Sequence, residues 1–433
     1  MDSKEYLRIF IEHRTLSNLY QSNVSEEDLH MVKSFLTLLR KERLLLEEES
    51  NLSDIDYKLR IQKCVDESDN NQIKELYYDH IKSICDSIRK AYIGPLYHIY
   101  LNISDYFIEN YAQEFFDQEI RTAISSGRVN AGDSLQPMEL TALLNSFCDK
   151  ENTVDYYNPF AGLASLSLIL PKHIDYRGEE LYTFSWLLGK LRMLIYERPH
   201  TWQFEKMDSI AGWVENEEYE VVEFYDFICF NPPFNMSYSN QHKELFKNNE
   251  YLNPQNANSL IISECFKLLN PGGKMVFLMT TGFLSSNASK DKRLKKDLVE
   301  NGHIEKIIAL PSRILNHTNI AVNIIVVTKS DEPHDEVEFI DASENFNKGD
   351  GKLHTIKLIE TLQLIEDDSS ELKRKVHIKE IASNGYNLSV NRYVFEDLGL
   401  SIEEKHTLVK LNDLIKLVPR KKPEIAIGKF VRI

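Results

Sequence analysis

Two consecutive prolines between an asparagine and a phenylalanine form the most distinctive short motif of the chain. The motif is Asn231-Pro232-Pro233-Phe234, and it follows the apolar run 226–230, which predicts a β-strand. The prolines end that strand, because they cannot continue a hydrogen-bonded ladder. At the carboxyl end of a strand, where α/β proteins bind ligands, this stiff turn would hold the side-chain oxygen of Asn231 and the carbonyl oxygen of Pro232 at fixed positions.

Two acceptor oxygens at fixed positions match a planar amino group, which carries two N–H donors. Phe234 would stack on the ring that bears this amino group. When both N–H groups donate hydrogen bonds to these oxygens, the nitrogen lone pair is localised for attack on a methyl group of a sulfonium centre. The chemistry then needs no other nucleophile and no metal ion. The predicted catalytic residues are therefore Asn231, Pro232, Pro233 and Phe234. The structural alternative is a proline-rich loop with an incidental aromatic residue.

A second segment of interest lies upstream, where the β-rich run 154–157 turns into small residues. A strand that leads through such a turn into a helix brings backbone N–H groups and the helix N-terminus close to a ligand. This suits a nucleoside cofactor, although the segment holds one glycine where such loops often hold three. The predicted cofactor-binding residues of this loop are Asn158, Pro159, Phe160, Ala161, Gly162 and Ala164.

Acidic residues follow the next two β-rich runs. A carboxylate at the tip of the second strand of such a sheet can accept hydrogen bonds from both hydroxyls of a ribose. We select Glu180 for this role and Glu179 as the second choice, with a solvated acidic turn as the structural alternative. Asp208 follows the third run, where it would meet the adenine of the cofactor. It can equally be the N-cap of a helix that starts just before Ile210.

Short β-rich runs alternate with helical stretches from about residue 150 onward, and this alternation is typical of a doubly wound α/β sheet. Residues 270–273, which read Asn-Pro-Gly-Gly, predict a turn before one of the strands. After about residue 345 the pattern weakens into polar and charged residues. The predicted strands cover residues 154–157, 174–177, 202–207, 224–230, 274–279, 304–310 and 321–328.

The N-terminal part of the chain has the pattern of a helical domain. No glycine precedes Gly94 and no proline precedes Pro95, so the usual breakers of regular structure are missing there. Ser25 and Asp28 have the spacing of a helix N-cap. We predict a helical domain over residues 1–125, with a structural or partner-binding role. Apolar residues recur in it at helical spacing in two sets, Leu29, Val32, Leu36 and Leu39, and Ile73, Leu76, Ile81, Ile84 and Ile88.

The composition indicates a soluble globular protein of two or three packed units, because the chain has 433 residues of which 42% are apolar. No stretch has the length and apolarity of a membrane span, and the N-terminus lacks the layout of a signal peptide, which predicts a cytoplasmic protein. The five cysteines are scattered, so we expect reduced core residues rather than disulfides or a zinc site. The net charge of −16 argues against a surface that binds phosphates everywhere, but it permits a local basic cleft or a partner that supplies most phosphate contacts.

Together these motifs resemble the modification (M) subunit of type I restriction-modification systems, within the N6-adenine DNA methyltransferase family. The resemblance covers residues 1 to about 400, and residues 231–234 match the family's catalytic motif in full. In the cofactor loop Pro159 and Gly162 match the family, whereas Asn158 replaces its Asp and Ala164 replaces its last Gly. Residues 134–137, Ser-Leu-Gln-Pro, stand where the family usually has Tyr-Thr-Pro. Further similar segments are 178–180, 207–209, 268–274, 309–312, 385–388 and 392–393.

The resemblance implies a doubly wound, Rossmann-like α/β methyltransferase sheet preceded by an N-terminal helical domain. It implies S-adenosyl-L-methionine as the cofactor and N6 of adenine in double-stranded DNA as the methyl acceptor. The partners that it implies are a specificity subunit or a fused specificity domain, and a restriction subunit. The corresponding domains would be 1–125 (helical), 126–345 (catalytic) and 346–400 (C-terminal extension of the catalytic domain).

Residues 401–433 resemble the opening of a DNA-specificity domain. Such domains commonly begin with a Leu-x-Asp-Ile/Leu phrase, which Leu411 to Leu414 match. The basic run 420–422 would contact phosphate, or else form a solvated tail. A segment this short cannot bury a core of its own, so we expect the domain to continue in a longer protein or to be completed by a partner. A chain that delegates sequence recognition in this way need not be basic overall.

Two other functions remain open on the sequence. The first is methylation of a different planar amine, such as a protein glutamine or an RNA guanine, because Asn-Pro-Pro-aromatic motifs occur there too. The second is a catalytically weak, methyltransferase-like scaffold for a DNA-recognition partner, which the altered cofactor loop suggests. The long helical N-terminus favours the DNA enzyme over the first alternative, and the intact motif 231–234 argues against the second.

Overall fold

The computed structural model describes residues 3–19, 25–45, 56–125, 135–218, 223–315, 319–330, 332–349 and 353–394. All of them belong to one compact unit, Met1–Val394. The predicted specificity-type segment 401–433 lies outside the described residues.

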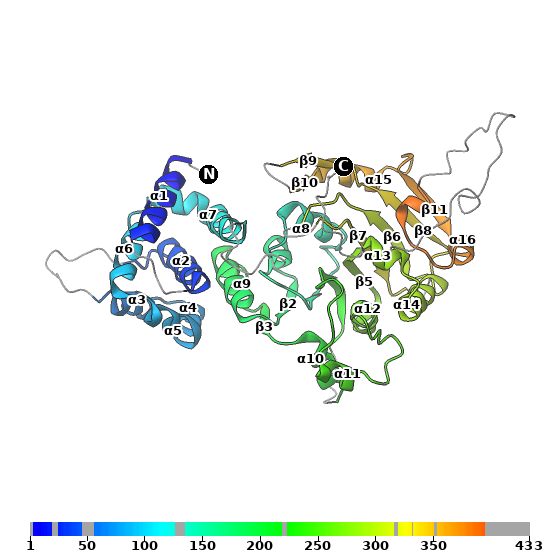
Figure 1. The fold of residues 1–433 in the computed structure, drawn as a ribbon, viewed down its shortest axis with the longest axis horizontal. Coiled ribbons are helices and arrows are strands. Elements are labelled where there is room, and N and C mark those ends of the chain that lie inside the picture. Colours follow the sequence, from blue (N-terminus) through cyan, green and yellow to red (C-terminus); the bar gives the residue numbers. More distant parts are fainter. Residues whose placement is uncertain are drawn as a thin grey trace, which may run out of the picture. The chain divides into compact units, whose positions relative to one another are not determined.

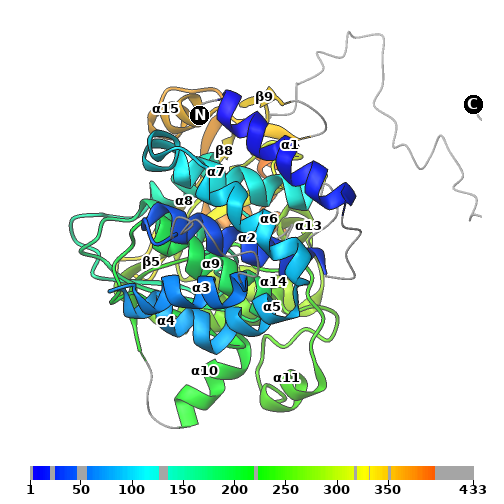
Figure 2. The ribbon, with the colours of Figure 1, turned by 90° about the vertical axis from the view of Figure 1, so that its left-hand side faces the viewer.

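Helices make up the N-terminal part of the described chain (Figure 2). They are α1 (Ser3–Leu19), α2 (Glu26–Lys41), α3 (Tyr57–Asp66), α4 (Asn71–Leu76), the π-helical η1 (Tyr77–Ile81), α5 (Lys82–Ser87), α6 (Lys90–Leu101) and α7 (Asp105–Ser125). The side chain of Ser25 accepts a hydrogen bond from the N–H of Asp28, which confirms the predicted N-cap of α2. Leu29, Val32 and Leu36 are buried, as their helical spacing predicts.

A sheet of nine strands forms the second part of the unit, in the order β11-β8-β6-β7-β5-β4-β1-β2-β3. Its strands are β1 (Asp155–Asn158), β2 (Asp175–Glu180), β3 (Gln203–Lys206), β4 (Tyr225–Phe230), β5 (Leu269–Thr280), β6 (Ile304–Ala309), β7 (Val322–Thr328), β8 (Glu336–Asp341) and β11 (Lys373–His377). The strands from β3 to β5 run parallel, β7 is antiparallel to both of its neighbours, and β11 is antiparallel to β8. The predicted α/β fold with N-terminal helices is confirmed.

The sheet extends beyond the seven predicted strands, all of which are present. The strands β8 and β11 were not predicted, and neither was the small antiparallel hairpin of β9 (Phe346–Lys348) and β10 (His354–Ile356). The edge strand β11 reads Lys-Arg-Lys-Val-His, and Val376 is its one buried residue. A strand whose other four residues are basic carries almost no apolar periodicity, so the sequence pattern fails there.

The predicted turn at residues 270–273 is wrong, because these residues lie inside β5. The pairing with β4 shifts there: Tyr225 lies opposite Leu269, and Phe227 lies opposite Lys274. Gly272 adopts φ +79°, which a glycine tolerates, and its N–H donates to the carbonyl of Lys329 beside it. The chain therefore bulges without leaving the sheet.

Helices cover the sheet, and α9 joins it to the N-terminal helices (Figure 1). The covering elements are α8 (Met138–Asn145), the 3-10 helix η3 (Ser165–Ile169), α9 (Thr183–Ile195), α10 (Ser209–Glu218), α11 (Asn240–Leu245), α12 (Asn258–Lys267), α13 (Thr281–Ser285), α14 (Ser289–Glu300), α15 (Leu358–Glu366), α16 (Ile378–Ser383) and the 3-10 helix η4 (Val390–Arg392). Helix α9 packs against α2 and α7 on one side and against β2 and β3 on the other. Its residues Leu187, Leu188 and Leu191 belong to the same buried cluster as the N-terminal helices.

The five cysteines are buried and free, as predicted. Within the described ranges, no helix combines the length and the apolar character that crossing a membrane requires.

Candidate active site

The order of the strands brings two of the predicted segments together. Strands β1 and β4 are parallel neighbours, although β2 and β3 lie between them in the sequence. The chain therefore leaves β1 toward one side of the sheet and returns through β4 on the other side, which is the kind of switch point where open α/β sheets bind ligands. Asn158 ends β1 and Asn231 directly follows β4, so both segments lie at this carboxyl edge.

A cavity of about 460 Å³ opens at this edge. Ten of the residues that the sequence analysis singles out line it, and the remaining three, Asn158, Ala161 and Ala164, do not. The ten lining residues are Pro159, Phe160, Gly162, Glu179, Glu180, Asp208, Asn231, Pro232, Pro233 and Phe234.

The motif 231–234 presents one polar side chain and one ring to this cavity. The side chain of Asn231 is partly exposed and makes no hydrogen bond to another residue of the described chain, whereas Pro232 is buried. The ring of Phe234 packs on the sheet core with one part and lines the cavity with another. The motif is therefore anchored by its apolar residues and leaves the amide of Asn231 available to a ligand.

A reciprocal pair of asparagines fixes the chain directly after the motif. Asn235 adopts φ +54°, its N–H donates to Oδ1 of Asn258 at 3.2 Å, and the Nδ2 of Asn258 donates back to Oδ1 of Asn235 at 3.1 Å. This pair was not predicted from the sequence. The asparagine directly after the motif is the signal that could have found it, because asparagine tolerates positive φ better than most other residues with a side chain.

The loop after β1 is held in a tight turn by its own backbone and by its neighbours. Gly162 has φ +55° and Ala164 has φ +54°. The N–H of Gly162 donates to Oε2 of Glu180 at 2.9 Å, and the carbonyl of Pro159 accepts from the hydroxyl of Ser209 at 2.6 Å. The left-handed region costs a residue with a Cβ roughly 1 to 2 kcal/mol, so Ala164 adopts at a cost a conformation that a glycine would adopt freely.

Asn158 stabilises this loop through hydrogen bonds of its side chain. Its side chain is buried, its Nδ2 donates to the hydroxyl of Tyr176 at 3.4 Å, and its Oδ1 accepts from the N–H of Phe160 at 3.4 Å. Both bonds are long for their type. The geometry favours a loop-shaping role for Asn158 over direct contact with a ligand.

The two neighbouring glutamates differ in what their carboxylates contact. Glu179 accepts from the hydroxyl of Tyr157 at 2.7 Å and from Nε of Arg177 at 3.2 Å. Glu180 accepts from backbone N–H groups, including those of Gly162 at 2.9 Å and Tyr182 at 2.8 Å. A carboxylate has about four lone-pair sites and Glu180 lines the cavity, so this carboxylate can still accept a hydrogen bond from a ligand. Burial raises the pKa of both carboxyls above the ordinary glutamate value.

Asp208 is the N-cap of a helix and also lines the cavity. Its Oδ1 accepts from the N–H groups of Ile210 and Ala211 at 3.1 and 3.3 Å and so caps the start of α10, while the residue also lines the cavity. Its Oδ2 pairs at 2.7 Å with Nε2 of His242, a buried residue of α11 that lines the cavity too. His242 was not predicted from the sequence, because no periodic pattern marks it.

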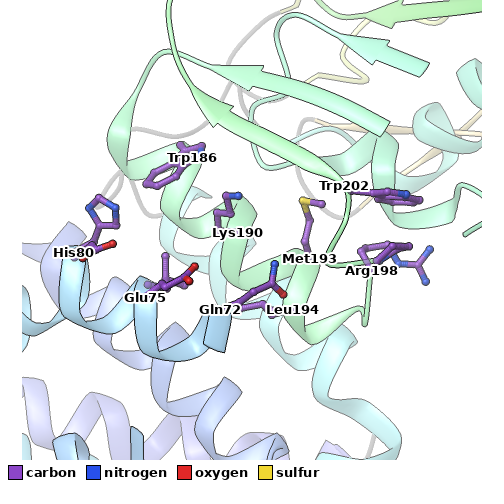
Figure 3. A pocket seen from close by; sticks show the side chains of 12 residues that line it. Gln72, Glu75, His80, Trp186, Lys190, Met193, Leu194, Arg198 and Trp202 are labelled. Atoms are coloured by element: carbon purple, nitrogen blue, oxygen red, sulfur yellow. The ribbon is translucent and has the colours of Figure 1, made fainter. Parts of the chain in front are cut away.

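A second cavity of about 160 Å³ lies between the N-terminal helices and α9 and holds none of the predicted site residues (Figure 3). Glu75 and His80 of the N-terminal helices face Trp186 and Lys190 of α9 across it. The rings of His80 and Trp186 meet edge to face with centroids 5.0 Å apart. The larger cavity is therefore the candidate active site.

Comparison with known proteins relates this site to one family. The sequence model of the family described as N-6 DNA Methylase matches residues 106–398. The chain is 24% identical over 291 residues to the type I restriction enzyme MpnII methylase subunit of Mycoplasma pneumoniae. This match covers 61% of this chain and 53% of that protein. The chain is 23% identical over 345 residues to the type I restriction enzyme MjaVII methylase subunit of Methanocaldococcus jannaschii, covering 71% and 56%. The chain thus spans little more than half the length of these curated relatives.

Among solved structures, the methyltransferase subunit of the type I restriction-modification system from Streptococcus thermophilus has a similar fold. The TM-score is 0.69 at 17% identity, and the match covers 90% of this chain and 99% of that one. At this identity the likeness is one of fold.

Proposed function

Because this chain belongs to the N-6 DNA methylase family, we propose that it is a site-specific DNA methyltransferase that transfers a methyl group from S-adenosylmethionine to N6 of adenine, as the modification component of a restriction-modification system. One observation carries the proposal: Asn231, Pro232 and Phe234 line the same cavity as Gly162 and Glu180. A motif suited to an amino group and a carboxylate suited to a ribose thus open into one space. The family membership agrees with the resemblance that the motifs indicate.

The residues around the cavity fit S-adenosylmethionine. A volume of about 460 Å³ suits a small-molecule cofactor, since such sites span roughly 300–1,000 Å³. Glu180 would accept hydrogen bonds from the ribose hydroxyls, the loop at Gly162 would back the methionine portion, and Asp208 would meet the adenine. The apolar side chains of Met207 and Ile210 line the cavity beside Asp208. The bound cofactor supplies an electrophilic methyl group on a sulfonium centre.

The motif 231–234 would act on the target base. Oδ1 of Asn231 and the carbonyl of Pro232 would accept the two N–H bonds of the adenine amino group, which localises the nitrogen lone pair, and Phe234 would stack on the base. The base must leave the duplex to reach this edge of the sheet, as for other enzymes that modify a base. Because a stiff turn already fixes these acceptors, little free energy is needed to reorient them during the reaction. This motif therefore supplies positioning and polarisation without a separate nucleophile.

Sequencing genomic DNA for N6-methyladenine, with and without this protein in the cell, tests the proposal. We expect methylated adenines at one short sequence motif, present only when the protein is made. If the two genomes carry the same methylation, and methyl groups instead appear on protein glutamines or RNA guanines, the DNA assignment is wrong and the first alternative is correct.

Calorimetry separates the enzyme from the catalytically weak scaffold. The loop that carries Ala164 keeps a tight turn and a bonded Gly162 N–H, which supports a site that still binds its cofactor. We expect the purified protein to bind S-adenosylhomocysteine. Absence of binding at millimolar ligand would favour the scaffold.

Recognition of the DNA sequence would rest on a specificity subunit or a fused specificity domain, with a restriction subunit as a further partner. The sequence of residues 401–433 and the net charge of −16 support this division of labour. We expect the chain by itself to show little sequence-selective affinity for duplex DNA in a gel-shift assay at physiological salt. Tight, site-selective binding by the chain alone would move the recognition function into residues 1–400.

A further inference from the structure

A buried arginine connects the N-terminal helices to the loop after β1. Arg192 of α9 has no exposed surface, and its Nε and Nη2 donate to the two carboxylate oxygens of Asp117 at 2.7 and 2.6 Å. Its Nη1 donates to the carbonyl of Leu163 at 3.2 Å and to the hydroxyl of Ser165 at 2.8 Å. Asp117 lies on α7, so a single guanidinium binds both the helical segment and the candidate cofactor loop.

The contacts continue from this arginine to the candidate ribose carboxylate. The carbonyl of Leu163 lies between Gly162 and Ala164, the two residues of the loop with positive φ. On its other side Gly162 donates its N–H to Glu180. Hydrogen bonds thus connect Asp117 to Arg192, Arg192 to the carbonyl of Leu163 and the N–H of Gly162 to Glu180, and the covalent backbone of residues 162–163 joins the last two. Neither Asp117 nor Arg192 lines the cavity.

The planar guanidinium explains why an arginine occupies this position. It has donors enough to hold a carboxylate with two parallel bonds and still reach a second group, which a lysine ammonium cannot do in this geometry. A buried ion pair is costly to break, because the remaining charge stays desolvated. The hydroxyl of Tyr196 also donates to Asp117 at 3.0 Å, which further orients the carboxylate.

We propose that Asp117 and Arg192 are positioning residues for the cofactor, so that the packing of helix α7 on α9 sets the affinity for S-adenosyl compounds. The inference rests on the proposed cofactor site. The positive φ of Ala164 destabilises the conformation of the loop. Arg192 stabilises this conformation by donating a hydrogen bond to the carbonyl of Leu163, directly before Ala164. By linkage, a bound cofactor must in turn strengthen the attachment of α7.

The test compares Asp117→Asn with the parent in two measurements. The amide keeps the size of the side chain but has one acceptor oxygen, so it can no longer hold both guanidinium donors. We expect about tenfold weaker binding of S-adenosylhomocysteine by calorimetry well below the unfolding temperature. In the ligand-free protein we expect faster amide hydrogen exchange in residues 159–166. The gentler variant Ser165→Ala, which removes one bond and leaves the ion pair intact, should weaken binding by a few-fold.

A matched control is Glu338→Gln. Glu338 is also buried and pairs with two cations, Lys306 and Lys373, but on the far part of the sheet. It should lower the unfolding temperature without changing ligand affinity or loop exchange. The inference is overturned if Asp117→Asn lowers stability alone, with exchange in the loop or ligand affinity unchanged. A parent protein that binds no S-adenosyl compound would refute the proposed function, whereas loop exchange would still decide whether Asp117 holds the loop.

Discussion

Replacement of Asn231 by alanine is expected to lower the rate of methyl transfer by roughly two to three orders of magnitude, as for the loss of one preorganised polar group that acts in the transition state. The side chain opens into the cavity and makes no other hydrogen bond in the described chain, so its removal should leave the fold and the cofactor site intact. Single-turnover methylation of duplex DNA by the assembled enzyme measures the rate, and calorimetry measures cofactor binding. The expected pattern is a lower rate at unchanged cofactor affinity.

Asn270→Ala provides a matched control. Asn270 donates to Asp226 at 2.9 Å, near the amino end of the strand that the catalytic motif follows, and it does not line the cavity. The control should retain the parental rate. If Asn231→Ala methylates DNA within a few-fold of the parent, the role assigned to Asn231 is wrong.

Replacement of Glu180 by alanine is expected to weaken S-adenosylhomocysteine binding by about 1 to 3 kcal/mol, which is roughly 5- to 150-fold. The variant leaves two ribose hydroxyls without their acceptor, and it also frees the N–H groups of Gly162 and Tyr182. Calorimetry measures the change. Glu179→Gln is the matched comparison, because the carboxylate of Glu179 is occupied by Tyr157 and Arg177. A large loss in Glu179→Gln together with parental affinity in Glu180→Ala would transfer the role to Glu179.

The pH dependence of binding should identify the same residue. Burial raises the pKa of Glu180, so this carboxyl takes up a proton at a higher pH than an ordinary glutamate. Since the ionised form accepts from both hydroxyls, affinity should fall on acidification through that raised pKa, and Glu180→Gln should lose this dependence. The stability of the fold should depend on pH in the opposite direction to the affinity for the cofactor. A carboxyl whose pKa is higher in the folded than in the unfolded state favours folding at low pH, and this contribution is lost as the pH rises through the raised value.

Much of the candidate site is visible in the sequence because it rests on local chemistry. Two prolines end a strand wherever they occur, and an apolar run before them predicts that strand, so the place of Asn231 follows from adjacent residues alone. The same holds for the N-cap at Ser25, where the donor and the acceptor are three residues apart. The acids at the ends of β2 and β3 are local features of this kind as well.

Which of these residues face a common space was decided by the tertiary structure. Asn158, Ala161 and Ala164 belong to the predicted loop, yet they do not line the cavity: the side chain of Asn158 bonds Tyr176 instead, and both alanines are buried. The difference between Glu179 and Glu180 arises likewise from their neighbours, since Tyr157 donates to Glu179 and the N–H of Gly162 donates to Glu180. Neither fact can be read from residue types, because both depend on groups that are distant in the sequence.

The long-range polar contacts were the least predictable part of the protein. Asp117 and Arg192 lie on two helices far apart in the chain, and the pairs formed by Asp208 with His242 and by Asn235 with Asn258 also depend on the packed fold. The sequence by itself determined seven strands of the sheet, the helical character of the N-terminal part and the place where the reactive motif ends its strand, since apolar periodicity and proline act over a few residues. The tertiary structure alone decided which polar groups meet, because a single charged or amide side chain carries no periodic signal and finds its partner only when the strand order and helix packing bring the two together.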